Sequence, residues 1–338
     1  QKKRRVFNVL LFLNQMFGFA VWQRITYTLK YTNFQLIDYT KILLLNVDLT
    51  RLKNLEELTF FREISQETAM CANKKTASYH FCTITIYDSG IVLFSGSIHK
   101  MYNSLRNIKA PNYKNDATYK GFNGNQFNLN NIIEIRTHLM LLFDCKPHQM
   151  KFQNVEFGVN ADTLFTPDSF IRGLLYHNGK QFEYRYNNNY SQSVHQQFIF
   201  KIYNKGNQYG MSKNTIRVEL KFRKMKEVKQ LGIETFADIN TKTLDNAKQE
   251  LLRRFDEVVY YDYTINKKEL SKTLKRRISK YSNPRYWLVT LRSNHRDREK
   301  KKLKEIITNH SENLHNQVRQ DIEKKCVIIN RHLKSVNV

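Results

Sequence analysis

Three segments of the chain alternate apolar and polar residues with a two-residue period, and this feature constrains the fold most. They are "NVEFGVN" (154–160), "FIFKIYNK" (198–205) and "TIRVELKFR" (215–223). Because side chains alternate across a β-strand, each segment places its apolar residues on one face and its polar residues on the other. We therefore expect three strands, each with one buried face and one functional or solvated face.

The polar faces of these strands carry an unusual set of groups. Their polar positions are Lys201, Tyr203 and Lys205 in one segment, Arg217, Glu219, Lys221 and Arg223 in another, and Asn154, Glu156, Gly158 and Asn160 in the third. If the three strands are neighbours, two carboxylates and one tyrosine meet on a basic surface.

This combination suits attack of a tyrosine on a phosphodiester. A free phenol has a pKa of about 10, so attack near neutral pH requires a cation beside the phenolate. Lys201 and Lys205 are expected to lower the pKa of Tyr203 and to hold flanking phosphates. Mg²⁺ or Mn²⁺ held by the two carboxylates would polarise a phosphate oxygen. The products are a 5′-phosphotyrosyl linkage and a free 3′ hydroxyl.

Each part of this hypothesis has a plainer alternative. Alternating charges on a strand also fit an ordinary solvated face with a tyrosine on it. Glu156 lies between two apolar residues, and an ion pair with a lysine across the sheet would account for it equally well. His99, in "GSIHKMYN", is either a metal ligand or a surface or capping residue at a strand end.

The net charge predicts a polyanionic partner. The 338 residues include 56 Lys and Arg against 30 Asp and Glu, which leaves +26, far above what solubility requires. Nucleic acid is the commonest such partner, and the 19 tyrosines and 22 phenylalanines could supply surfaces for unstacked bases. The sequence signals for a phosphate-binding loop, a dinucleotide fold and a zinc protease are absent, as is a His-x-His pair.

The body of the chain, residues 36–262, reads as an α+β fold with an antiparallel sheet and helices packed on one face. The further strands expected are 37–49, 79–87 and 91–99, the latter two joined at Asp88-Ser89-Gly90, and 180–187. The helices expected are 129–143, 167–177 and 241–261, with a helix-permissive stretch at 52–67.

A basic helical region, 263–338, follows a boundary near Asp262. Helical periodicity at 267–281 and 295–325, broken at Asn283-Pro284, predicts a helix-turn-helix or winged-helix module. The residues expected to contact DNA are Lys100, Arg217, Lys221, Arg223, Lys275, Arg276, Arg277 and Arg285.

The termini and cysteines indicate the cellular compartment. Residues 1–35 begin with "QKKRR" before an apolar stretch too short and too polar for a membrane span, so we expect an extension outside the fold. The four cysteines form no C-x-x-C pair, which favours a reduced, cytoplasmic protein without a membrane partner.

The order and spacing of several motifs resemble a known group of proteins. "LFSGSIHKMYNSL", "NVEFGVN", "FKIYNKGNQY" and "IRVELKFRKM" resemble replication initiators of the filamentous-phage gene II and phage X type, including rolling-circle proteins of Bacteroidetes elements. Staphylococcal rolling-circle plasmid initiators are more distantly similar. The resemblance covers about residues 37–261, and its most specific element is a Y-x-K strand followed by an R-x-E strand.

The resemblance implies a nicking activity with named residues. It implies Tyr203 as the nucleophile, Lys205 near the phosphate, Glu219 as a metal ligand and Glu156 as the second, with His99 as a further candidate. Residues 36–262 would nick and rejoin one strand of single-stranded or hairpin origin DNA, with a host helicase and polymerase as partners. The alternatives are a relaxase or transposase of a mobile element and a non-catalytic DNA-binding repressor.

Overall fold

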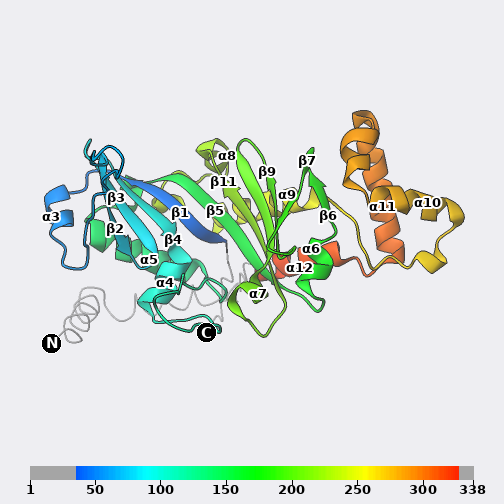
Figure 1. Ribbon diagram of the computed structural model, residues 1–338, viewed down its shortest axis with the longest axis horizontal. Helices are drawn as coiled ribbons and strands as arrows, with labels where there is room; N and C mark the ends of the chain where they lie inside the picture. The colour runs from blue at the N-terminus through cyan, green and yellow to red at the C-terminus, as the bar shows by residue number, and fades with distance from the viewer. Residues whose placement is uncertain (1–35, 327–338) are drawn as a thin grey trace, which may run out of the picture.

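A nine-stranded antiparallel sheet forms the centre of the computed structural model, which describes residues 36–326 (Figure 1). In spatial order its strands are β2 (Lys74–Tyr79), β3 (Cys82–Tyr87), β4 (Val92–Ser97), β1 (Ile37–Leu44), β5 (Met150–Asp162), β11 (Thr215–Phe222), β10 (Phe198–Asn204), β9 (Tyr190–Val194) and β8 (Glu183–Arg185). The α+β class and the antiparallel sheet predicted from the sequence are confirmed.

The three alternating segments are adjacent strands at the middle of this sheet. β5 pairs with β11, and β11 pairs with β10, both antiparallel. In this register Glu219 lies opposite Lys201 on one side and Gly158 on the other, while Tyr203 lies opposite Arg217. The polar faces predicted from the two-residue period therefore coincide.

Helices cover the apolar face of the sheet and pack with it into one core (Figure 1). They are α5 (Leu129–Phe143), α8 (Met225–Gln230) and α9 (Thr241–Asp256). The bounds of α5 are those predicted, because Asn128 caps its first turn and Asp144 ends it in the left-handed conformation. Further helices are α3 (Leu49–Lys53), α4 (Ile98–Leu105) and α7 (Lys205–Tyr209).

A small second sheet corrects two helix predictions. Its strands are β12 (Val258–Tyr260), β6 (Leu174–His177) and β7 (Lys180–Gln181). The helix expected over 167–177 stops after α6 (Pro167–Ile171), and the helix expected over 241–261 stops before β12. At Gly173 the backbone oxygen of Tyr261 lies 2.3 Å from where a Cβ would be, so only a glycine allows the two segments to approach so closely. The Tyr261 N–H donates to the Gly173 carbonyl at 2.8 Å.

Two further predictions differ in local detail. The helix-permissive stretch 52–67 contributes only the end of α3, and the strand predicted over 79–87 is split between β2 and β3. His80 and Phe81 turn the chain there with positive φ angles of 46° and 63°. The hairpin across Asp88-Ser89-Gly90 is confirmed as β3 and β4.

The C-terminal region is helical in its described part. It contains α10 (Lys272–Tyr281), a π-helical turn (Tyr286–Thr290), α11 (Arg296–His310) and α12 (Leu314–Lys325). The helix predicted over 295–325 is thus two helices, because Asn313 caps a new one. No strand occurs between 263 and 326, so a wing has no counterpart there. Short 3₁₀ turns are Pro147–Gln149, Phe236–Asp238, Lys267–Glu269 and Ser293–His295.

The last described helix returns to the main sheet. α12 packs against β5 and α9, and Lys325 Nζ lies 2.8 Å from a carboxylate oxygen of Asp162 at the end of β5. The division of the chain at Asp262 stays a prediction, and α12, which follows Asp262 in sequence, packs against elements that precede it. Within 36–326 no helix is long and apolar enough to cross a membrane. The predicted N-terminal extension lies outside the described residues.

Candidate functional site

Tyr203 lies near the end of β10, with its phenol oxygen between a carboxylate and an amine. Its hydroxyl donates to Glu219 Oε2 at 3.2 Å, and Lys205 Nζ lies 3.4 Å from the phenol oxygen of Tyr203. Lys205 is not on the strand as expected, because Asn204 caps a helix there and Lys205 is the first residue of α7. The expected grouping of the two side chains nevertheless exists.

Lys201 joins the two carboxylates predicted for the site. Its Nζ lies 2.5 Å from Glu219 Oε1 and 3.1 Å from Glu156 Oε2. Lys221 Nζ contacts the other oxygen of Glu156 at 2.7 Å. The alternative interpretation of Glu156, an ion pair with a lysine across the sheet, is therefore observed twice over.

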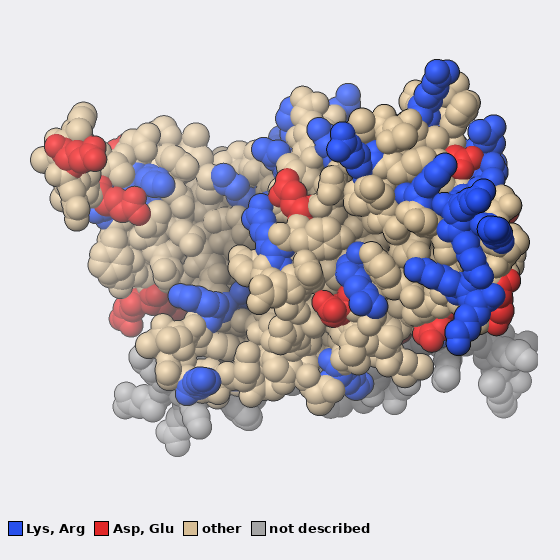
Figure 2. Space-filling view, turned by 45° about the vertical axis from the view of Figure 1, so that its right-hand side comes forward, with Lys and Arg blue, Asp and Glu red and all other residues tan. Residues whose placement is uncertain are grey.

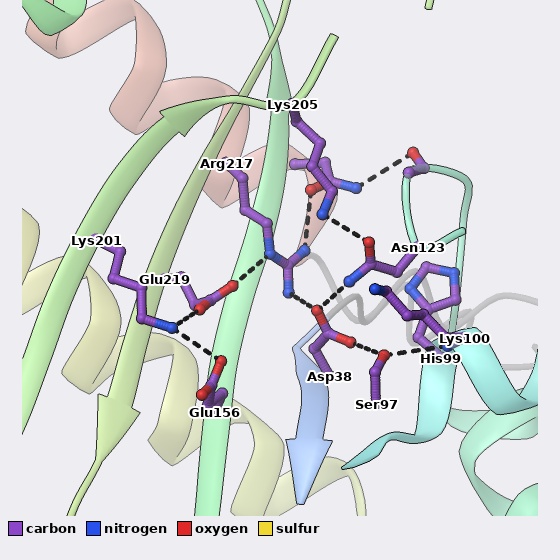
Figure 3. A network of polar contacts seen from close by, with 12 residues as sticks. Asp38, Ser97, His99, Lys100, Asn123, Glu156, Lys201, Lys205, Arg217 and Glu219 are labelled. Atoms are coloured by element: carbon purple, nitrogen blue, oxygen red, sulfur yellow. Dashed lines mark hydrogen bonds and ion pairs between the residues drawn. The ribbon is translucent and has the colours of Figure 1, made fainter. Parts of the chain in front are cut away.

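Arg217 extends this chain of charges to a third acid. Its Nε donates to Glu219 Oε2 at 2.8 Å and its Nη2 to Asp38 Oδ2 at 3.0 Å, while Nη1 donates to Asn160 (Figure 3). Arg217 is only 3% exposed. A buried guanidinium is stable only when paired in this way, so Arg217 and Asp38 depend on one another.

Gly158 explains how the Arg217 side chain reaches across β5. A Cβ at position 158 would lie 2.7 Å from the Arg217 Nη2 atom, closer than side-chain atoms approach one another. The glycine therefore leaves the space over which the guanidinium lies on its way from β11 to Asp38 on β1.

Asn123 links the Arg217 network to Lys205. Its side-chain oxygen accepts from Lys205 Nζ at 2.6 Å, and its Nδ2 donates to Asp38 Oδ2 (Figure 3). The same oxygen of Asn123 also accepts from the Tyr209 hydroxyl at 2.5 Å. Ser97 also donates to Asp38. Lys205 is 1% exposed. The polar face expected to be solvated is thus largely buried around Arg217, Glu219 and Lys205.

Burial and neighbouring charges set the protonation of these groups. Burial would raise the pKa of Glu219, but Lys201 and Arg217 outweigh it and hold the pKa well below 4.5. Burial and the charge of Glu219 raise the pKa of Glu156 to about 7. Lys201 is held charged, because the two glutamates raise its pKa against the effect of burial.

The pKa of the Tyr203 phenol shifts in the direction opposite to the one expected from the sequence, and the pKa of the neighbouring Lys205 shifts as well. Burial, with Glu219 as the next contribution, raises the pKa of Tyr203 well above 10. Burial and then Arg217 lower the pKa of Lys205 well below 10.5. The expectation that the lysines lower the pKa of Tyr203 is therefore wrong for this arrangement, because burial and a nearby carboxylate dominate.

His99 does not join the two glutamates. It lies in the first turn of α4, where its Nε2 is 2.8 Å from Asn125 Oδ1 and its ring stacks on Phe127. Burial lowers its pKa to about 3, so it is neutral. It is neither the strand-end surface residue nor a cap, and no contact places it beside Glu156 or Glu219.

The predicted ligand set does not fit a divalent cation in this arrangement. The oxygens of Glu156 and Glu219 are already paired with Lys201, Lys221, Arg217 and Tyr203. In the described part of the chain, no group of three or more His, Cys, Asp or Glu side chains could hold a metal ion. A cation would bind the pair only by displacing Lys201.

The residues predicted to contact DNA fall into two groups. Arg217 is buried and fully paired, which differs from the surface position expected for it, and Lys100 donates to the carbonyl of Lys120. Lys100 and the remaining residues all keep part of their surface exposed: Lys221, Arg223, Lys275, Arg276, Arg277 and Arg285. Figure 2 shows Lys and Arg gathered on the side of the molecule formed by the C-terminal helices.

Sequence reasoning missed Asp38 and Asn123, and it gave no role to Gly158. Asp38 carried a usable signal, because it is a charge inside the apolar run "LIDYTKILLL", where an acid needs a partner. Asn123 lies in a loop rich in Gly and Asn and carried no such signal.

Comparison with known proteins adds no assignment: no family model matches the chain, and no curated protein matches it in sequence.

Proposed function

We propose that the protein cuts and rejoins one strand of DNA through a covalent bond to Tyr203, as a rolling-circle replication initiator does. The observation that carries the proposal is the position of the phenol oxygen, 3.2 Å from Glu219 and 3.4 Å from Lys205. A nucleophile with a proton acceptor in hydrogen-bond reach, itself held by a third group, is the arrangement that such catalysis requires.

Lys205 is the group best suited to take the phenol proton. Burial and then Arg217 lower its pKa well below 10.5, which favours the neutral amine that accepts a proton, whereas Glu219, whose pKa is held well below 4.5, is a weak base. Asn123 fixes the amine from the other side at 2.6 Å. Glu219 then orients the hydroxyl, and Arg217 holds Glu219 in place as a positioning residue.

The cleavage step balances with these groups alone. The Tyr203 oxygen forms a bond to phosphorus while the bond from phosphorus to the 3′ oxygen breaks. The phenol proton passes to Lys205 and then to the departing 3′ oxygen. The products are a 5′-phosphotyrosyl linkage and a free 3′ hydroxyl, and rejoining is the reverse.

Other parts of the hypothesis stay predictions. They are the Mg²⁺ or Mn²⁺ requirement, a cytoplasmic location, host helicase and polymerase partners, and origin binding by the exposed lysines and arginines of α10 in a helix-turn-helix arrangement. A relaxase or transposase would use the same tyrosine chemistry on another substrate. A non-catalytic DNA-binding repressor is favoured by one observation, the fully paired carboxylates around Lys201.

The test is formation of a covalent adduct on labelled single-stranded origin DNA, with and without Mg²⁺ or Mn²⁺. We expect an adduct that resists denaturation, that Tyr203→Phe abolishes and that Lys205→Met reduces by roughly 10²- to 10⁴-fold in rate. Tyr263→Phe, an exposed tyrosine distant in sequence, is the control. An adduct that persists in Tyr203→Phe removes the nucleophile assignment, and no adduct under any condition favours the repressor.

A further inference from the structure

A cavity of about 320 Å³ opens beside the candidate site and differs from it in chemistry. It lies between α7 and the loop that follows α4, residues 112–121. Its described lining includes three lysines and three tyrosines and no Asp or Glu: Lys100, Lys114, Lys120, Tyr113, Tyr119 and Tyr209. The larger cavity of about 430 Å³ near α11 is lined by acids as well as lysines, so it is less suited to an anion.

The cavity is built into the fold by contacts between its two walls. Asn112 donates its backbone N–H to the carbonyl of Tyr209 at 3.2 Å and its Nδ2 to the carbonyl of Gln208 at 3.2 Å. The loop leaves the cavity at Gly121, which has a φ of +77° and where a Cβ would lie 2.9 Å from the Phe81 ring. Preformed pockets of about 300–1,000 Å³ are the size used by small ligands.

Its side chains offer flat rings and unpaired ammonium groups together. Tyr113 and Tyr119 meet edge to face at 5.1 Å. Lys114 and Lys120 are exposed and form no ion pair with a described residue. Aromatic surfaces on which bases stack, next to amines that attract phosphates, are the features of sites for single-stranded nucleic acid.

Tyr209 connects this cavity to the nucleophile. It forms part of the cavity wall, and its ring lies 4.9 Å from Lys205 Nζ, the same atom that is 3.4 Å from the Tyr203 oxygen. A strand with its phosphate at Tyr203 would therefore have its neighbouring nucleotides within reach of the cavity.

We propose that this cavity binds an unpaired nucleotide of single-stranded DNA, with the base against the tyrosines and the phosphate against Lys114 and Lys120. The inference rests on the proposed function, because it assigns the cavity to the strand that Tyr203 cuts. It selects single strands over duplex, since a paired base cannot enter a cavity and stack there.

The test measures binding without cleavage. Full-length Tyr203→Phe protein is titrated into fluorescein-labelled oligothymidine and, separately, into a labelled duplex of the same length, and fluorescence anisotropy is recorded. We expect Tyr113→Ala and Lys114→Ala each to weaken single-strand binding, Tyr113→Ala by about 5- to 100-fold, and to leave duplex binding unchanged. Tyr263→Ala and Lys242→Ala, on exposed residues outside the cavity, are matched controls.

Two results separate this inference from the proposed function. If both cavity variants bind oligothymidine as tightly as the parent, or lose duplex binding equally, the cavity assignment is wrong even where an adduct forms. If single-strand binding falls selectively but no adduct forms with native Tyr203, the cavity stands and the nicking activity does not. Should circular dichroism show that Tyr113→Ala does not fold, Lys114→Ala, at an exposed position, carries the test.

Discussion

The absence of a side chain at Gly158 allows Arg217 to reach Asp38, and the substitution Gly158→Ala tests this. Gly158→Ala would place its Cβ 2.7 Å from the Arg217 guanidinium and force that side chain away. The displaced arginine would leave Asp38 buried without its partner, at a cost of about 3–5 kcal/mol in the free energy of unfolding. Urea denaturation measures the loss. In an Arg217→Met background the same alanine should cost much less. An equal cost in both backgrounds would contradict the proposed contact.

Lys201 occupies the position between two carboxylates that a metal would need. A cation has to displace Lys201 here, so we expect Lys201→Met to bind Mn²⁺ more tightly than the parent, because two facing glutamates then lack their ammonium partner. Isothermal titration calorimetry measures both. Glu219→Gln added to Lys201→Met should remove the binding. Stoichiometric binding by the parent that Glu219→Gln abolishes would instead support the metal role implied by the resemblance.

Helix α12 packs the C-terminal region against the sheet, and we expect the stability of this packing to depend on pH. Asp262 Oδ2 accepts the Leu314 N–H at its start, and His315 stacks on Phe255 at 4.2 Å. Burial lowers the pKa of His315 to about 4, with Lys304 and Arg319 also lowering it, against a hydrogen bond to Phe255 and the charge of Asp256. The helix is therefore expected to tolerate only the neutral imidazole.

The sign of the pH effect follows from that shift. Below pH 6.5 the unfolded chain takes up a proton at His315 that the folded chain refuses, so stability is lost as pH falls from 6.5 towards 4. The loss is on the order of 1–3 kcal/mol. Urea midpoints at pH 7.5 and 4.5 measure it, and His315→Phe should flatten the dependence. The dependence would persist in part, because burial also lowers the pKa of His195 to about 4 and that of His99 to about 3. If the urea midpoint of His315→Phe depends on pH as strongly as that of the parent, His315 is not a source of the pH dependence.

The charge of the whole molecule predicts how DNA binding responds to salt. With a net charge of +26, and exposed arginines and lysines gathered over the C-terminal helices, phosphate contacts should supply most of the affinity (Figure 2). If about eight phosphates are neutralised, log K falls with log salt at a slope of roughly −7. Anisotropy titrations at several salt concentrations give the slope. Replacing Lys275 and Arg276 by glutamine should make it shallower by about 2, whereas Lys242→Gln should not. A slope near zero in the parent would contradict an electrostatic DNA surface.

Local pattern in the sequence was enough to place side chains on faces. The two-residue period of β5, β10 and β11 fixed which residues share a side, because a strand permits only that alternation. Helix α5 was predicted from apolar residues at helical spacing, which is an equally local pattern. Local pattern failed at Gly173 and at His80-Phe81, where a neighbouring backbone or a turn overrode it.

What the sequence by itself determined is therefore the polar side of each strand, which carries Tyr203 and Lys201 in β10, Glu219 in β11 and Glu156 in β5, whereas the strand order that makes the three neighbours came from the fold. Only the tertiary structure decided what those groups do to one another. Arg217 and Asp38 are 179 positions apart, and their pairing depends on the strand order β1-β5-β11 and on the space left by Gly158. Burial, which is a property of the whole fold, then raises the pKa of Tyr203 and lowers that of Lys205. The spacing of residues along a strand specifies the side to which each side chain points. The residues that it pairs with, and its pKa, depend on which distant residues the packed core brings into contact.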